Sequence, residues 1–171
     1  MKFKNCLNKL DESVKITVQA KNKYELMYIV NKTIKEQGNN CDLNFIDTSK
    51  ITDMSTLFSE SNFNGDISKW NVSKVMDMSN MFAYSKFNGD ISKWNVSNVK
   101  NMSLMFFSSE FNGDISKWDV SNVKDMGSMF DKSKFNGDIS KWDVSKVNYM
   151  YCMFKKSPLD GNEPDWYKKR K

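Results

Sequence analysis

The stretch Phe63-Asn64-Gly65-Asp66-Ile67-Ser68-Lys69-Trp70-Asn71-Val72-Ser73 decides the architecture, because it returns nearly unchanged at Phe87, Phe111 and Phe135. The copies lie 24 residues apart, and a more divergent copy precedes them. A fixed period between about 20 and 50 residues is typical of units that stack on one another and share a continuous core. The sequence therefore predicts five units over residues 42–154, starting near residues 42, 66, 90, 114 and 138.

The order of apolar residues inside one unit indicates which kind of stack to expect. Ile67, Trp70 and Val72 match the first half of the leucine-rich-repeat template, whose period is about 20–29 residues. Trp70 and Val72 are two apart, as on one side of a short strand. Met78 and Met81 with Phe82 are spaced by three and four, which favours one or two helical turns. The predicted fold class is an α/β repeat solenoid, with a parallel sheet on one face and short helical turns on the other.

Methionine and tryptophan are concentrated at fixed positions of the unit. Nine of the twelve methionines form two columns, starting at Met54 and Met81, and four of the five tryptophans form a third. That third column consists of Trp70, Trp94, Trp118 and Trp142. Residues at equivalent positions of stacked units usually build the core, and this is the interpretation we favour. An exposed tryptophan ladder for sugars or bases is the alternative for the third column.

The two ends of the chain are expected to cover the terminal units. Residues 1–41 are predicted to form a strand–helix cap: Val14, Ile16 and Val18 alternate as in a strand, and Asn22 with Glu25 resembles a capping box. The helix should bury Leu26, Met27, Val30 and Ile34 and end at Gly38. Residues 155–171 are predicted to form a short closing cap with a basic tail.

Composition excludes several classes of function. The chain has no histidine, its three cysteines are far apart, and it contains no P-loop or dinucleotide glycine motif. Because the commonest general base and metal ligand is missing, we expect no enzyme activity, no metal and no cofactor. The formal charge is +5, with most of the excess in the tail Lys168–Lys171, which argues against nucleic acid. No signal peptide or transmembrane segment is evident, and we expect a monomer.

The unit F-N-G-D-I-S-K-W-[ND]-V-S-x-V-x-x-M-x-x-M-F over about residues 42–154 resembles the BspA-like leucine-rich-repeat surface proteins of bacteria. This repeat is also found in mycoplasma lipoproteins. The resemblance implies a right-handed leucine-rich-repeat solenoid and display on the bacterial surface for adhesion or host contact. It implies no catalytic residues. The compartment stays open between the cell surface, which the resemblance implies, and the cytoplasm, which the N-terminal sequence favours.

The expected strand face opposite the core is the candidate binding surface. Extended faces of stacked repeats commonly bind other proteins, so we predict an interaction or scaffolding module with a protein partner. The alternatives are a structural or antigenic spacer array, or a carbohydrate binder that uses the tryptophan column. The candidate partner-binding residues are Lys69, Asn71, Lys93, Asn95, Lys117, Asp119, Lys141 and Asp143.

Two further polar columns are better explained by local structure than by chemistry. The first is Asp66, Asp90, Asp114 and Asp138, for which calcium is the alternative; the chain lacks the dense acidic loops of calcium sites, so we predict turn capping. The second is Asn64, Asn88, Asn112 and Asn136, which we predict to form a hydrogen-bonded ladder.

Overall fold

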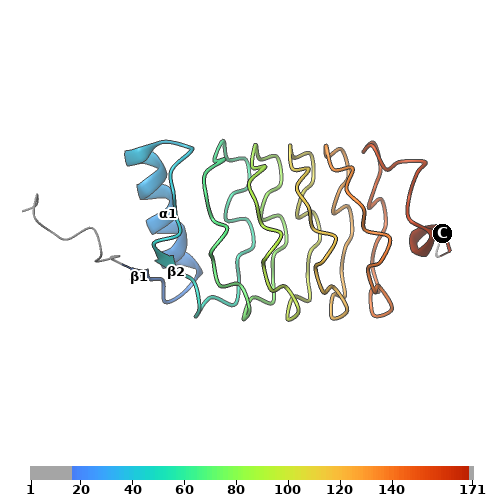
Figure 1. The fold of residues 1–171 in the computed structure, drawn as a ribbon, viewed down its shortest axis with the longest axis horizontal. Helices are drawn as coiled ribbons and strands as arrows, with labels where there is room; N and C mark the ends of the chain where they lie inside the picture. Colours follow the sequence, from blue (N-terminus) through green and yellow to red (C-terminus); the bar gives the residue numbers. More distant parts are fainter. Residues whose placement is uncertain (1–16, 170–171) are drawn as a thin grey trace, which may run out of the picture.

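The computed structural model describes residues 17–169 and contains little regular secondary structure. The elements are β1 (Val18–Gln19), α1 (Lys23–Gln37), β2 (Ile46–Asp47) and α2 (Asp165–Lys168). β1 and β2 pair in parallel, with Val18 opposite Ile46. Helix α1 stands at one end of an elongated molecule and α2 at the other, and the 24-residue units lie side by side between them (Figure 1).

The predicted fold class, an α/β leucine-rich-repeat solenoid, is wrong. Between β2 and α2 the described chain forms no helix and no strand longer than an isolated bridge. Tight turns take their place: the Trp70 N–H donates to the Ile67 carbonyl at 3.1 Å. The physical reason is side-chain competition, because Asp66 Oδ1 accepts from the Ser68 N–H at 2.8 Å and folds the backbone before it can extend.

Neighbouring units are joined by their backbones along one surface, which we call the ladder face: residues 53–60, 77–84, 101–108, 125–132 and 149–156. Isolated parallel bridges connect Asp53 to Asp77, and equivalent bridges link each later unit to the next, ending at Tyr149. Four N–H groups of each segment donate to carbonyls of the next, for example Met54 to Asp77 at 2.9 Å. The segment expected to form helical turns therefore carries the pairing, and the expected strand does not.

The interior is a set of stacked side-chain columns. Phenylalanine rings at one position of every unit lie nearly parallel, with centroids 5.6 Å apart for Phe58 and Phe82 and 5.7 Å for Phe82 and Phe106. Eight of the nine methionines in the two columns are fully buried, and Met150 is partly buried. The core interpretation of the methionine columns is thus confirmed for every position except Met150, which is only partly buried.

The tryptophan column also belongs to the core, as we expected. Each of its four members is only 4–5% exposed. The indole N–H of each donates to a carbonyl 27 residues earlier, as from Trp118 to Ile91 at 3.1 Å, which satisfies the buried donor. Trp166 in α2 makes the same bond to Ile139 at 2.9 Å and extends the column. Its place 24 residues after Trp142 was visible in the sequence and was missed.

Glycine is required where a phenylalanine ring folds back over the chain. A Cβ atom on Gly113 would lie 2.9 Å from two ring atoms of Phe111, and Gly89 meets Phe87 in the same way. Real Cβ atoms essentially never approach so closely. The Phe-Asn-Gly triplet is therefore one packing unit, in which the ring occupies the space that glycine leaves.

The N-terminal helix was predicted accurately. Asn22 caps α1 by accepting from the Glu25 N–H at 3.0 Å, and Gly38 ends the helix with a φ of 90°. Leu26 and Val30 are fully buried against the first unit, while Met27 and Ile34 are partly buried. Of the expected strand, Val18 belongs to β1, whereas Val14 and Ile16 lie outside the described residues. The predicted domain boundaries at residues 41 and 155 remain predictions.

Candidate interaction surface

The eight predicted binding residues form two columns on the surface, which we call the column face. All eight are exposed, and equivalent members are 24 positions apart: Lys69, Lys93, Lys117 and Lys141, beside Asn71, Asn95, Asp119 and Asp143. The face lies on turns rather than on a strand, because bonds such as Trp94 N–H to the Ile91 carbonyl at 3.1 Å close the backbone. The predicted residues are thus brought together in register, but the expected strand face does not exist.

The asparagine and aspartate column has a structural task in addition to any binding. Asn71 Oδ1 accepts from both the N–H and the hydroxyl of Ser73, at 3.1 and 2.7 Å. Asp119 Oδ1 accepts from the Ser121 N–H at 3.1 Å. The side chain and N–H of Ser121 hold the pKa of Asp119 below its usual value, against the nearby charge of Asp143, which acts to raise it. One oxygen of each side chain is therefore committed to its turn.

The lysine column lies between that column and a row of aspartates. Hydrogen bonds from the serine two residues later lower the pKa of Asp66, Asp90, Asp114 and Asp138. At Asp66 the largest contribution comes from the Ser68 N–H. The charge of Lys69 contributes in the same direction at Asp66. The prediction that these aspartates cap turns is confirmed by bonds of 2.8–2.9 Å. The lysine column therefore has carboxylates in every unit of the aspartate row, but in the Asn/Asp column only at Asp119 and Asp143.

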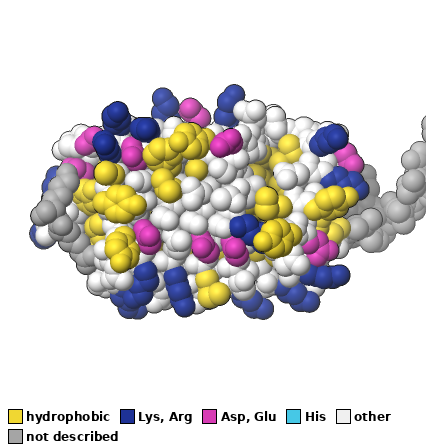
Figure 2. Space-filling model, turned by 180° about the vertical axis from the view of Figure 1, so that it is seen from behind, with side chains coloured by type: hydrophobic (Ala, Val, Ile, Leu, Met, Phe, Trp, Pro, Cys, Tyr) yellow, Lys and Arg dark blue, Asp and Glu magenta, His cyan; other side chains and the backbone are white. Residues whose placement is uncertain are grey.

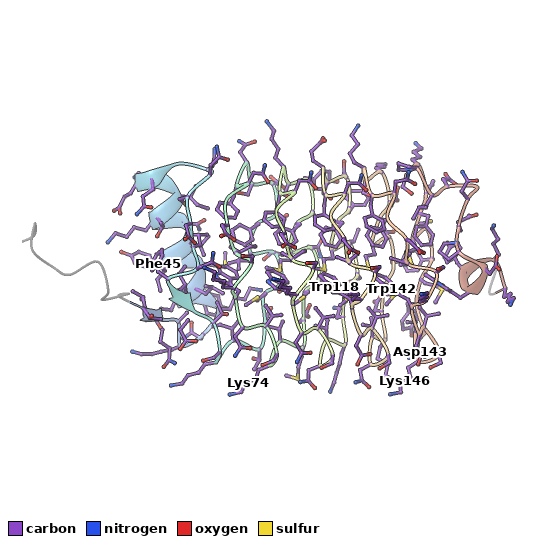
Figure 3. The ribbon with its side chains drawn as sticks, viewed as in Figure 1. Phe45, Lys74, Trp118, Trp142, Asp143 and Lys146 are labelled. Atoms are coloured by element: carbon purple, nitrogen blue, oxygen red, sulfur yellow. The ribbon has the colours of Figure 1, made fainter. Side chains whose placement is uncertain are left out.

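One edge of the column face is fixed by side chains that reach across to the preceding unit. Asn98 Nδ2 donates to the Ser73 carbonyl at 2.7 Å, and Lys146 Nζ donates to Asn122 Oδ1 at 2.8 Å. Lys74, Asp143 and Lys146 lie along this edge, whereas Trp118 and Trp142 lie in the interior (Figure 3). The lysines of the column face are thus exposed to solvent, whereas the tryptophans beneath it are buried and cannot reach a ligand.

The predicted asparagine ladder lies at another corner of each unit and is confirmed. Asn64 Oδ1 accepts from the Asn88 N–H at 2.8 Å, and Asn88 and Asn112 repeat the bond to the next unit at the same distance. An open groove of about 790 Å³ lies beside the first two of these asparagines, Asn64 and Asn88. Because the Oδ1 atoms of Asn64, Asn88 and Asn112 are used by the backbone of the next unit, the ladder is chiefly a structural device.

Sequence reasoning missed the aromatic side chains on the ladder face. Tyr84, Tyr149 and Tyr151 are 57, 61 and 70% exposed. Hydrophobic side chains form separate surface patches on the molecule seen from behind, with acidic groups between them and lysines toward both edges (Figure 2). Tyr149 stands where the other units have Asp or Asn, and Tyr151 where they have Ser or Gly. Those departures from the repeat were the available signal.

Comparisons with known proteins give a family but no activity. A family model described as "Mycoplasma protein of unknown function, DUF285" matches residues 25–110 and 107–169. No curated protein and no solved structure matches the chain. Within residues 17–169, no helix has the length and apolar character needed to cross a bilayer.

Proposed function

This chain belongs to the DUF285 family of Mycoplasma proteins of unknown function, and on that premise we propose that it is a protein-interaction module that binds a protein partner through the column face. The observation that carries the proposal is the exposure, in register, of all eight column residues. A surface that places a lysine beside an asparagine or aspartate four times suits an extended partner, because each unit adds a similar contact.

The column face is preorganised for binding. Its backbone is held by turn bonds, by the tryptophan N–H groups beneath it and by the asparagine bonds at its edge. A rigid surface loses little conformational entropy when a partner docks, so a larger share of the contact energy appears as affinity. Rows of opposite charge favour a partner that has charges of both signs, and they act mainly on association rate and specificity.

A binding role is proposed in preference to catalysis on the chemistry of the chain. There is no histidine, and the turn aspartates beside the column face (Asp66, Asp90, Asp114 and Asp138) recur from unit to unit, whereas an active site is normally unique. The resemblance to BspA-like surface proteins supports a finer proposal, in which the partner is met at the bacterial surface during adhesion or host contact. A structural spacer array is the competing proposal, and the same experiment decides between them.

The test is a matched pair of double charge reversals. Lys93→Glu with Lys117→Glu changes the column face, while Lys100→Glu with Lys124→Glu makes the same charge change at exposed lysines outside it. Chemical cross-linking in the native cell, followed by capture and mass spectrometry, measures the proteins retained. We expect the first variant to lose partners that the second keeps. Identical sets of captured proteins for wild type and both variants would favour a spacer.

A further inference from the structure

The backbone bonds of the ladder face form four continuous rows that run the length of the repeats. In the first row, Met54 donates to Asp77, Met78 to Asn101, Met102 to Asp125 and Met126 to Tyr149, all at 2.8–2.9 Å. The Asp77 carbonyl and the Met78 N–H belong to the same peptide group, so each group accepts on one side and donates on the other. The other three rows follow the same rule and begin at Thr56, Phe58 and Glu60.

Rows of this kind align peptide dipoles, as in an α-helix. Aligned dipoles leave a partial positive charge at the end where N–H groups are free and a partial negative charge at the carbonyl end. All four rows direct their N–H groups toward the C-terminal unit. Rows in the opposite sense, such as Lys134 N–H to Ser109 and Glu110 N–H to Ser85, run mostly outside the ladder face. At its margin, the N–H groups of Asn101, Asp125 and Tyr149 also donate backward, at 3.2–3.3 Å. The positive end of the ladder face is therefore residues 149–156, which we call the C-terminal edge.

Charged side chains of the chain itself match this polarity at both ends. At the α1 end, Lys23 Nζ lies 3.3 Å from Asp53 Oδ1 and also donates to Ser55 Oγ, which places a cation at the carbonyl end. At the C-terminal edge, the fourth row ends at the Lys156 N–H, which donates to Asp160 Oδ2 at 2.8 Å. A carboxylate thus already occupies one of the row ends, and this shows which ligand chemistry the edge accepts.

Two other row ends are open. Within residues 17–169, the Met150 and Cys152 N–H groups make no hydrogen bond, whereas the equivalent groups of every earlier unit are bonded. Cys152 is exposed, and its φ of 52° continues the left-handed position found in each unit. The third row ends at Phe154, which is buried against Trp166 and Tyr167, so a ligand has access to the first two.

We propose that the C-terminal edge binds the carboxylates of an acidic peptide segment on a partner protein. The open N–H groups of Met150 and Cys152 supply the donors, and the exposed Lys155 and Lys156 supply the charge. Tyr149 and Tyr151 are neighbours of the donors in the sequence, and their exposed rings offer contact area that a free ion would not use; the Tyr151 ring itself lies over Gly127 of the preceding unit. Backbone N–H groups left open at the edge of a hydrogen-bonded ladder are an established form of anion site. This site is separate from the column face and does not rest on the function proposed for it.

The test follows the backbone amide resonances of the folded protein by NMR during titration with a capped tetraglutamate peptide. We expect saturable shifts at Met150 and Cys152 and none at Met126 and Ser128, whose N–H groups are bonded in the same rows. A capped tetraglutamine peptide is the matched control. Equal shifts with tetraglutamine, equal affinity for acetate or inorganic phosphate, or no shift at the two amides would each overturn the proposal.

Two variants sharpen the result. Asp160→Ala frees the Lys156 N–H, so we expect that amide to join the responding set and the affinity to rise at least about twofold. Lys155→Glu with Lys156→Glu should weaken binding at least about fivefold, whereas Lys100→Glu with Lys124→Glu should leave it within about twofold. Equal weakening by both double variants would show a general charge effect and overturn the site.

Discussion

The ladder face and the column face belong to the same 24-residue unit but are held together by different chemistry. On the ladder face, backbone groups bond to backbone groups of the next unit, as from Phe82 to Met105 at 2.9 Å. On the column face, side chains make the bonds, as Asp119 Oδ1 does by accepting from the Ser121 N–H. Backbone bonds are open to almost any residue, whereas side-chain bonds demand particular ones. This difference explains why Phe-Asn-Gly-Asp-Ile-Ser-Lys-Trp is unchanged in four copies while the ladder face admits Tyr149 and Gly127.

The largest effect should come from removing a side chain that the column face needs. Trp118→Ala deletes a side chain that is 4% exposed and leaves the Ile91 carbonyl without its partner, so we expect a loss of about 3–5 kcal/mol in the free energy of unfolding. Urea unfolding followed by circular dichroism measures it. Trp118→Phe keeps most of the volume and should cost less. An unchanged unfolding midpoint in Trp118→Ala would contradict the assignment.

The next largest contrast is between a glycine of the Phe-Asn-Gly triplet and a glycine of the ladder face. Gly113→Ala places a Cβ atom 2.9 Å from the buried Phe111 ring, and overpacking of this kind costs about 1–3 kcal/mol. Gly127→Ala on the ladder face meets first the exposed Tyr151 ring at 3.1 Å, which can move, so its cost should stay under about 1 kcal/mol. Thermal unfolding of the two variants compares them directly. Equal losses would show that the two glycines are under the same constraint.

Acid should weaken the aspartate turns more than the backbone ladder. Hydrogen bonds from the following serine hold the pKa of Asp66, Asp90, Asp114 and Asp138 below the usual value. Because the folded pKa is lowered, the stabilisation is present above the unfolded pKa of about 4 and is lost as the pH decreases through the folded pKa. Replacing all four with Asn keeps an acceptor that does not titrate. We expect a smaller drop in urea midpoint between pH 7 and pH 3 in that variant than in wild type.

The smallest effect concerns the left-handed backbone of the ladder face. Glu60 is exposed and has a φ of 59°, a conformation that costs a residue with a Cβ atom about 1 kcal/mol or more and glycine almost nothing. Glu60→Gly should therefore raise the free energy of unfolding by up to about 1 kcal/mol. Glu110→Gly, at an exposed position without positive φ, should lower it by about 0.5–1 kcal/mol. Losses in both variants would show that φ at position 60 carries no strain.

The parts of the structure that side chains determine could be predicted from the sequence. Helix α1, the buried tryptophans, the aspartate turns and the asparagine ladder all follow from residue type and spacing, and Asn22 and Gly38 even fix the helix ends. The column face was located correctly as an exposed set of residues, although not as a strand. The function proposed for it was reached from the sequence and remains to be tested.

The fold class could not be predicted because the ladder face depends on backbone conformations that its residues do not signal. Thr56, Asn80, Leu104, Ser128 and Cys152 all have positive φ, and only asparagine commonly adopts it. Bonds between units impose these conformations and override local preference. The spacing of Met78, Met81 and Phe82 suits a helical turn as well as the turns that form, so periodicity alone could not decide between them.

The tryptophan bond that reaches 27 residues back has a consequence for how this protein can change in length. The bonds that Trp118 and its unit make stay within the unit or go to an adjacent one, and the partner equivalent to Ile91 exists in the unit before that. Deletion of residues 90–113 would bring the Trp118 N–H to the Ile67 carbonyl and leave the remaining donors and acceptors matched. Recombination between near-identical copies can therefore add or remove whole units without disturbing the cores or caps, and so vary the reach of the surface while its chemistry stays the same.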